Sequence, residues 1–98
     1  MRITKKQIQL ITKTVSHLAG ADAEVYLFGS RLDDQMKGGD IDLFIESDVK
    51  LSLIDRARIK IELESQLGLP VDIVSKTRSA IATPFQIIAQ SHAYQLQA

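Results

Sequence analysis

The segment 40–45, with the sequence DIDLFI, restricts the fold of this chain more than any other part of it. Its β-branched and aromatic residues favour a strand, in which successive side chains point to opposite faces. Asp40 and Asp42 then share one face, with Cα atoms about 6.6 Å apart by the rise of a strand. Ile41 and Leu43 point to the opposite face. The segment therefore predicts a sheet that packs one face against a core and carries two carboxylates on the other.

Helix signals lie on both sides of this strand. Thr4, followed three residues later by Gln7, is the pattern of a capping box, and Gly20 is a natural helix stop. Gly68 and Pro70 end a second helical run. The predicted helices are residues 4–19, 53–67 and 83–96, the predicted strands are residues 24–28, 40–45 and 71–74, and a loop at 31–39 and a turn at 47–50 connect them.

This order of elements predicts an α/β (α+β) fold with a three-stranded sheet, which can be mixed, and helices packed against it. On the second helix, one stripe of residues with helical spacing is expected to face the core. It consists of Ile54, Ala57, Ile61 and Ser65, broadened by Leu53, Leu63 and Leu67. The basic residues Arg56, Arg58 and Lys60 are expected to form a solvated face of the same helix.

Length and charge limit the classes of function. Ninety-eight residues are expected to form one domain, residues 1–98. Twelve basic and twelve acidic side chains cancel, which argues against extended nucleic-acid binding because such proteins usually carry a basic excess. The chain has no cysteine, no apolar run of about 18 residues and no secretory leader, so thiolate chemistry and a membrane span are not expected, and the cytoplasm is the expected location.

The aspartates are the candidates for chemistry. Two carboxylates on one strand face repel each other unless a cation lies between them, and Mg²⁺ prefers oxygen ligands. Asp72 stands in a third apolar strand, so three carboxylates converge if that strand pairs beside residues 40–45. Converging carboxylates of this kind suit two-metal phosphoryl transfer, and the third can serve as general base.

Gly29 and Ser30 follow directly after the first predicted strand. Glycine permits close approach of the backbone, serine adds a hydroxyl group, and free N–H groups at such a turn can hold phosphate oxygens. The pair is therefore a candidate phosphate loop.

Together these motifs resemble the signature of the DNA polymerase β-like nucleotidyltransferase superfamily. The resemblance consists of Phe28-Gly29-Ser30-Arg31, a gap of nine residues counted from 31 to 39, Asp40-Ile41-Asp42-Leu43, and Val71-Asp72-Ile73 as a third element. It covers about residues 4–75. It implies that Asp40 and Asp42 are metal ligands, that Asp72 is a third ligand or the base, and that Gly29, Ser30 and Arg31 contact the triphosphate.

The small size resembles the minimal nucleotidyltransferases of prokaryotes. These are often paired with a small helical HEPN-type protein, in some cases as the antitoxin that moves AMP from ATP onto a tyrosine of the toxin. The resemblance thus implies an adenylyltransferase that uses one or two Mg²⁺ ions and ATP or another nucleoside triphosphate, and that can form homo- or hetero-oligomers. One position departs from the pattern, because family members often carry a second arginine where this chain has Asp33. Lys37 or Arg78 would then have to supply the positive charge.

A second reading of the function stays open from sequence alone. The domain can keep the fold and nucleotide affinity and yet act by capping a partner without catalysis. The motifs also have structural readings, since Gly29-Ser30-Arg31 can be a strand-ending turn and the aspartates can be a solvated strand face. Aspartate is disfavoured within strands, and two on one face repel, which favours the functional reading of Asp40 and Asp42.

Overall fold

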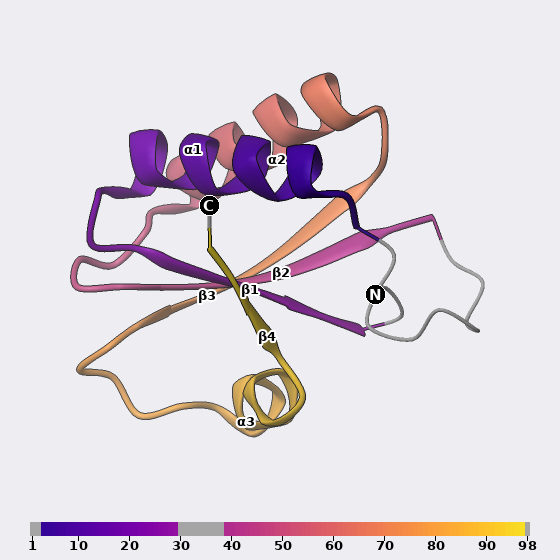
Figure 1. Cartoon of the computed structure of the whole chain (residues 1–98). Coiled ribbons are helices and arrows are strands. Elements are labelled where there is room, and N and C mark those ends of the chain that lie inside the picture. The colour runs from indigo at the N-terminus through magenta and orange to yellow at the C-terminus, as the bar shows by residue number, and fades with distance from the viewer. Residues whose placement is uncertain (1–2, 30–38, 98) are drawn as a thin grey trace.

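A computed structural model describes residues 3–29 and 39–97 of the chain (Figure 1). The elements are α1 (Lys5–Ala19), β1 (Glu24–Phe28), β2 (Ile41–Ser47), α2 (Leu53–Leu67), β3 (Val71–Thr77), α3 (Pro84–Ser91) and β4 (Tyr94–Leu96). The strands form one sheet in the order β3-β2-β1-β4. The β2–β3 pair is parallel and the other two pairs are antiparallel, so the sheet is mixed.

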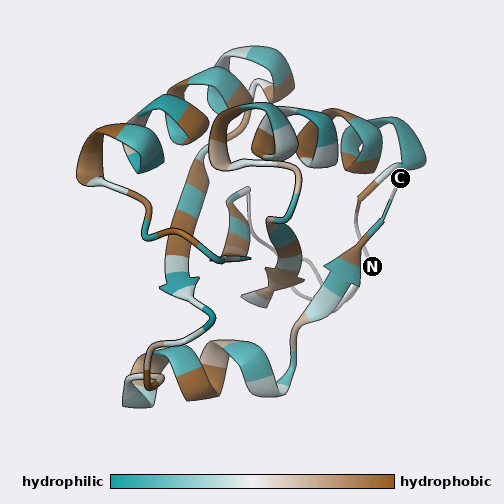
Figure 2. Cartoon of the chain, turned by 90° about the vertical axis from the view of Figure 1, so that its left-hand side faces the viewer, coloured by the Kyte–Doolittle hydropathy of each residue, from teal (hydrophilic) through white to brown (hydrophobic). Residues whose placement is uncertain are grey.

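The sheet separates two layers of helices. Helices α1 and α2 lie side by side over one face, and α3 lies on the opposite side, as Figures 1 and 2 show from two directions. Each helix begins with a capping box, in which the cap hydroxyl accepts from one backbone N–H and the third helical residue accepts from the cap N–H. The predicted α+β class is therefore confirmed.

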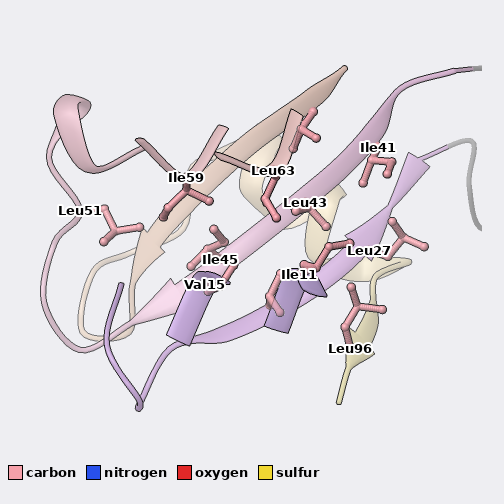
Figure 3. Packing of buried hydrophobic residues seen from close by; sticks show 12 residues of the cluster. Ile11, Val15, Leu27, Ile41, Leu43, Ile45, Leu51, Ile59, Leu63 and Leu96 are labelled. Atoms are coloured by element: carbon pink, nitrogen blue, oxygen red, sulfur yellow. The ribbon is translucent and has the colours of Figure 1, made fainter. Parts of the chain in front are cut away.

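The core lies between the sheet and the α1–α2 layer (Figure 3). Strand alternation directs Ile41, Leu43 and Ile45 of β2 into it, where they are fully buried. Helix α1 contributes Ile11 and Val15. The expected burial of one face of the segment 40–45 is thus confirmed, and the opposite face carries Asp42 together with Phe44, which is also fully buried.

The predicted stripe of α2 is wrong. Leu53, Ile54 and Ile61 are 74%, 68% and 66% exposed, whereas Ile59 and Leu63 are completely buried. Ile59 and Leu63 are one helical turn apart and therefore point in the same direction. The sequence offered two apolar stripes on this helix. Packing against the sheet selected Ile59 and Leu63, with Leu67 packed against the same core, so only the residues expected to broaden the stripe, Leu63 and Leu67, face inward as predicted.

The predicted helix 83–96 is too long, and the sheet has four strands instead of three. Helix α3 ends at Ser91, and residues 94–96 form β4, which pairs antiparallel with β1. Pairing supplies partners for the otherwise open edge of β1, and it places Leu96 in the core with 4% exposure. The pairing of the β1 edge and the burial of Leu96 both depend on tertiary contacts, so the local sequence does not reveal them.

Leu96→Ala tests this correction. Because Leu96 packs into the core, its truncation is expected to lower the free energy of unfolding by about 2–4 kcal/mol. Chemical denaturation would measure it, with Ile88→Ala in α3 as the matched control. Ile88 is 66% exposed, so its truncation is expected to cost less than about 0.5 kcal/mol. Equal effects of the two substitutions would contradict the placement of β4.

No helix in the described ranges 3–29 and 39–97 is long and apolar enough to cross a membrane.

Candidate active site

Asp42 and Asp72 lie directly opposite each other on neighbouring strands. The parallel register of β2 and β3 pairs Asp42 with Asp72. Residues paired in this way point to the same face of the sheet, and neighbouring strands are about 4.8 Å apart. That face is opposite to the one that Ile41 and Leu43 bury in the core. The strand pairing that the sequence left open therefore exists, and it brings these two carboxylates together.

The pKa of Asp42 responds to the neighbouring carboxylates. The pKa of Asp42 is raised, first because burial disfavours its charged form, then because of the negative charges of Asp72 and Asp40, and also through a hydrogen bond with the Asp72 carboxyl. Asp40 stands immediately before β2 and is exposed. The charges of Asp72 and Asp40 thus both act on Asp42 near the start of β2.

The site fits Mg²⁺ through few protein ligands. No group of three or more His, Cys, Asp or Glu side chains among residues 3–29 and 39–97 is close enough together to hold a metal ion. Mg²⁺ commonly binds through one or two carboxylates and completes its shell with water and substrate phosphates. The facing carboxylates of Asp42 and Asp72 match that requirement, and their mutual repulsion is the kind that a cation relieves.

Gly29 lies against the Asp42 carboxylate. It ends β1 with φ of +79°, a conformation that side chains rarely adopt. A Cβ at this position would overlap Oδ2 of Asp42 and lie 3.1 Å from its Cγ. Register explains the contact, because Phe28, the preceding residue, pairs with Asp42. Glycine is therefore required here for two reasons, the backbone conformation and the space that Asp42 occupies.

The remaining predicted loop residues, Ser30 and Arg31, lie outside the described residues, as do Asp33 and Lys37. Arg78 is described, and it does not compensate for Asp33. Its guanidinium pairs with Asp48 at 2.7 Å, with Glu24 at 2.9 Å and with Asp22 at 3.3 Å. This cluster lies at the far end of β2, because the Arg78 N–H donates to the carbonyl of Ser47, the last residue of that strand. Arg78 is therefore a structural residue.

Lys60 is a site neighbour that the sequence did not reveal. Its Nζ lies 3.9 Å from Oδ1 of Asp72 and 3.1 Å from Oε2 of Glu64, and it also donates to the Val71 carbonyl. Glu64 accepts from the Val71 N–H at 2.8 Å. Together the two side chains hold the peptide that precedes Asp72. The Lys60 side chain is 44% exposed, so it is solvated as expected and also reaches the Asp72 carboxylate. Only the buried stripe of Ile59 and Leu63 would have placed it beside β3.

One cavity of the described residues lies away from this site. A cavity of about 670 Å³ lies between α1 and α2 and is lined by residues such as Leu10, Thr14 and Ile61. Its lining includes none of the aspartates, and α1 and α2 cover the face of the sheet away from Asp42. The converging carboxylates, which raise the pKa of Asp42, are the better guide to the site.

Solved structures share this fold. The chain is similar to a mutant of the toxin–antitoxin MntA–HpeT, with 26% identity and a TM-score of 0.71 over 93% of this chain and 72% of that one. It is also similar to a chain in the solved complex of the tri-AMPylated HEPN toxin of Shewanella oneidensis with MNT antitoxin, with 28% identity and a TM-score of 0.61 over 93% of this chain and 72% of that one. A further structure from Shewanella oneidensis, at 20% identity and a TM-score of 0.64 over 97% and 73%, shares the fold alone. No curated protein matches.

The match to a family covers nearly the whole chain. Residues 8–95 match the nucleotidyltransferase domain, a span that contains Gly29, Asp40, Asp42 and Asp72. The resemblance drawn from the motifs is thereby confirmed. The chain belongs to the nucleotidyltransferase domain family.

Proposed function

We propose that the protein transfers AMP from ATP to a hydroxyl group in a reaction that depends on Mg²⁺. The observation that carries the proposal is the register of β2 and β3, which sets Asp42 opposite Asp72 within the charge field of Asp40. Two facing carboxylates, of which Asp42 has a raised pKa, are an unfavourable arrangement for stability. Such arrangements are characteristic of functional sites.

Each residue of the site has a distinct role in this proposal. Asp42 and Asp72 hold Mg²⁺, which when bound lowers the pKa of the attacking hydroxyl and neutralises charge on the triphosphate. Asp40 adds negative charge beside them, as a further metal ligand or as the base that accepts the hydroxyl proton. Gly29 leaves room for the Asp42 carboxylate, which a side chain at this position would displace. Ser30 and Arg31 are the proposed triphosphate contacts.

The proposed acceptor is a tyrosine on a small helical HEPN-type partner, which makes this protein an antitoxin. The similarity to the MNT antitoxin in complex with the tri-AMPylated HEPN toxin supports this acceptor, since AMPylation is the product that the proposed reaction would leave on its target. The similarity to MntA–HpeT supports the same type of partner.

A labelling experiment tests the proposal. The protein is incubated with α-labelled ATP, Mg²⁺ and a HEPN-type protein, and the acceptor is expected to carry label after denaturing electrophoresis. Replacing Mg²⁺ by EDTA is expected to remove the label. γ-Labelled ATP is the matched control, because transfer of AMP leaves the γ-phosphate in pyrophosphate. Absence of label with every nucleoside triphosphate would contradict the proposal.

A second candidate function is partner capping without catalysis. It is favoured by one observation, namely that no three-ligand metal group exists among the described residues. In cells that express the toxin, a protein with Asp42→Asn would still restore growth if capping alone is sufficient. Loss of protection, with the complex still formed in co-purification, would instead favour the enzyme.

A further inference from the structure

A second cavity, of about 300 Å³, lies along the outer edge of β3. We call it the β3-edge cavity. Its lining includes Lys50, Arg56, Ser75, Lys76, Thr77 and Gln86, which places it between the first turns of α2 and α3. Among the described residues that line it, none is acidic and three are cationic. A half-enclosed space with this composition is suited to an anion.

Arg56 is the unusual residue of this cavity. It precedes Ile59 by three residues and Leu63 by seven, so it lies on the buried stripe of α2. Its Nε is buried without a hydrogen-bond partner, and none of the ion pairs among the described residues includes Arg56. An unpartnered buried donor destabilises a fold, so a native one calls for an explanation. An anion that enters the cavity would supply the acceptor.

The other two cations differ in how firmly they are held. The Lys76 side chain is only 8% exposed, and its Nζ donates to the carbonyls of Thr77 and Arg78. Glu46 lies 3.6 Å from this Nζ and offsets part of its charge. Lys50 is exposed and takes part in none of the described ion pairs. The site thus combines the firmly held ammonium group of Lys76, the exposed one of Lys50 and the guanidinium of Arg56.

The outer edge of β3 also presents backbone hydrogen-bonding groups to the cavity. The Ser75 carbonyl accepts from Nε2 of Gln86 at 3.0 Å, so it points away from β2 and toward α3. In a strand, the N–H of a residue points to the same side as its carbonyl, so the Ser75 N–H also faces this edge. Backbone N–H groups beside an arginine are typical partners of phosphate oxygens.

We propose that the β3-edge cavity binds a phosphate group, held by the Arg56 guanidinium together with Lys50 and Lys76. Its volume is at the lower limit of small-molecule sites, which fits free phosphate or a small phosphomonoester. The site is separate from the proposed active site, since Thr77 is five residues beyond Asp72 on β3, about 16 Å by strand rise. It does not depend on the proposed transfer reaction.

Titration of the ¹⁵N-labelled protein with inorganic phosphate tests this proposal by NMR. Saturable shifts are expected at the Arg56 Nε–H and at the amides of Ser75 and Thr77, and not at Gly29. Sodium chloride at equal ionic strength is the reference. A parallel titration with glycerol phosphate shows whether the bound phosphate group belongs to a small molecule or is free phosphate. Tighter binding of the ester identifies a phosphorylated small molecule, and tighter binding of inorganic phosphate identifies the free ion. Shifts that chloride reproduces would overturn the proposal.

Variants on α2 sharpen the test. Arg56→Met is expected to weaken phosphate binding about tenfold, because it removes the only forked donor. Arg58→Met is the matched control on the same helix, since Arg58 lines the cavity between α1 and α2 instead, and it should bind phosphate as the wild type does. Lys50→Met, at an exposed position that cannot disturb folding, is expected to weaken binding about threefold. Unchanged binding in both Lys50→Met and Arg56→Met would overturn the proposal.

Discussion

Asp42→Asn is expected to abolish transfer and, at the same time, to make the metal-free protein more stable. The transfer rate should fall by roughly 10³-fold, because an amide cannot hold Mg²⁺ in place of a carboxylate or stabilise charge through it. Stability should rise because burial and the charges of Asp72 and Asp40 disfavour the ionised Asp42 in the fold. A rise in melting temperature together with a loss of activity distinguishes a functional carboxylate from a structural one.

The stability gain has a defined pH dependence. Since the folded pKa of Asp42 is raised above its ordinary value of 3.8, the folded state binds its proton more tightly than the unfolded state does. The wild type therefore loses stability as the pH rises from 3.8 through the raised pKa, and it has lost this contribution once the pH is above that pKa. Thermal melts in EDTA should show the advantage of Asp42→Asn growing over that window and then staying constant.

Controls separate this effect from a general change in charge. Glu62→Gln makes the same chemical change on the exposed side of α2, and it is expected to leave both activity and stability nearly unchanged. Mg²⁺ should raise the melting temperature of the wild type and of Glu62→Gln but not of Asp42→Asn. A wild type that Mg²⁺ fails to stabilise, with or without ATP, would argue against a metal site at Asp42.

Gly29→Ala is expected to lower the free energy of unfolding by about 2–4 kcal/mol. Two effects add in this value. The backbone at Gly29 has φ of +79°, and the new methyl group would overlap Oδ2 of Asp42. Denaturant unfolding measures the loss. The same substitution pushes the Asp42 carboxylate away from Asp72, so we expect transfer to fall sharply in the protein that remains folded.

Two other glycines separate the contributions. Gly68 has a similar φ of +70°, yet nothing would lie within 4 Å of its Cβ, so Gly68→Ala measures the backbone effect alone, about 1 kcal/mol. A Cβ at Gly39 also meets nothing within 4 Å, and Gly39→Ala is expected to be close to neutral. Adding Asp42→Ala to Gly29→Ala removes the overlapped carboxylate and should recover part of the loss. Simple additivity of these two substitutions would refute the contact.

The segment 40–45 shows what the sequence could predict. Its alternation is a local property, and the burial of Ile41 and Leu43 with Asp42 on the opposite face followed from it directly. The alternation did not predict that Asp42 and Asp72 converge. The register of β2 and β3 depends on how α2, which connects the two strands, packs against the sheet. The expectation that Asp72 lies near Asp42 came from the order of the motifs along the chain. The geometry of each strand by itself could not predict it.

Two elements were beyond the reach of local patterns. Helix α2 carries two apolar stripes, and only the sheet decides that Ile59 and Leu63 face inward and bring Lys60 beside Asp72. Residues 94–96 continue an acceptable helical pattern, but the open edge of β1 binds them as a strand. In both cases tertiary contacts outweighed local propensity, whose differences are of order 1 kcal/mol or less per residue.

The pairing of β4 with β1 has a consequence for the order in which the protein can fold. Val25 of the first strand pairs with Leu96 of the last, so the sheet joins parts of the chain that leave the ribosome at very different times. During synthesis, β1 and α1 emerge early but lack the residue that closes their side of the core. Non-local pairing of this kind slows folding. The nascent chain therefore keeps an open strand edge until residues 94–96 have left the exit tunnel, and an open edge of this kind can pair with other chains.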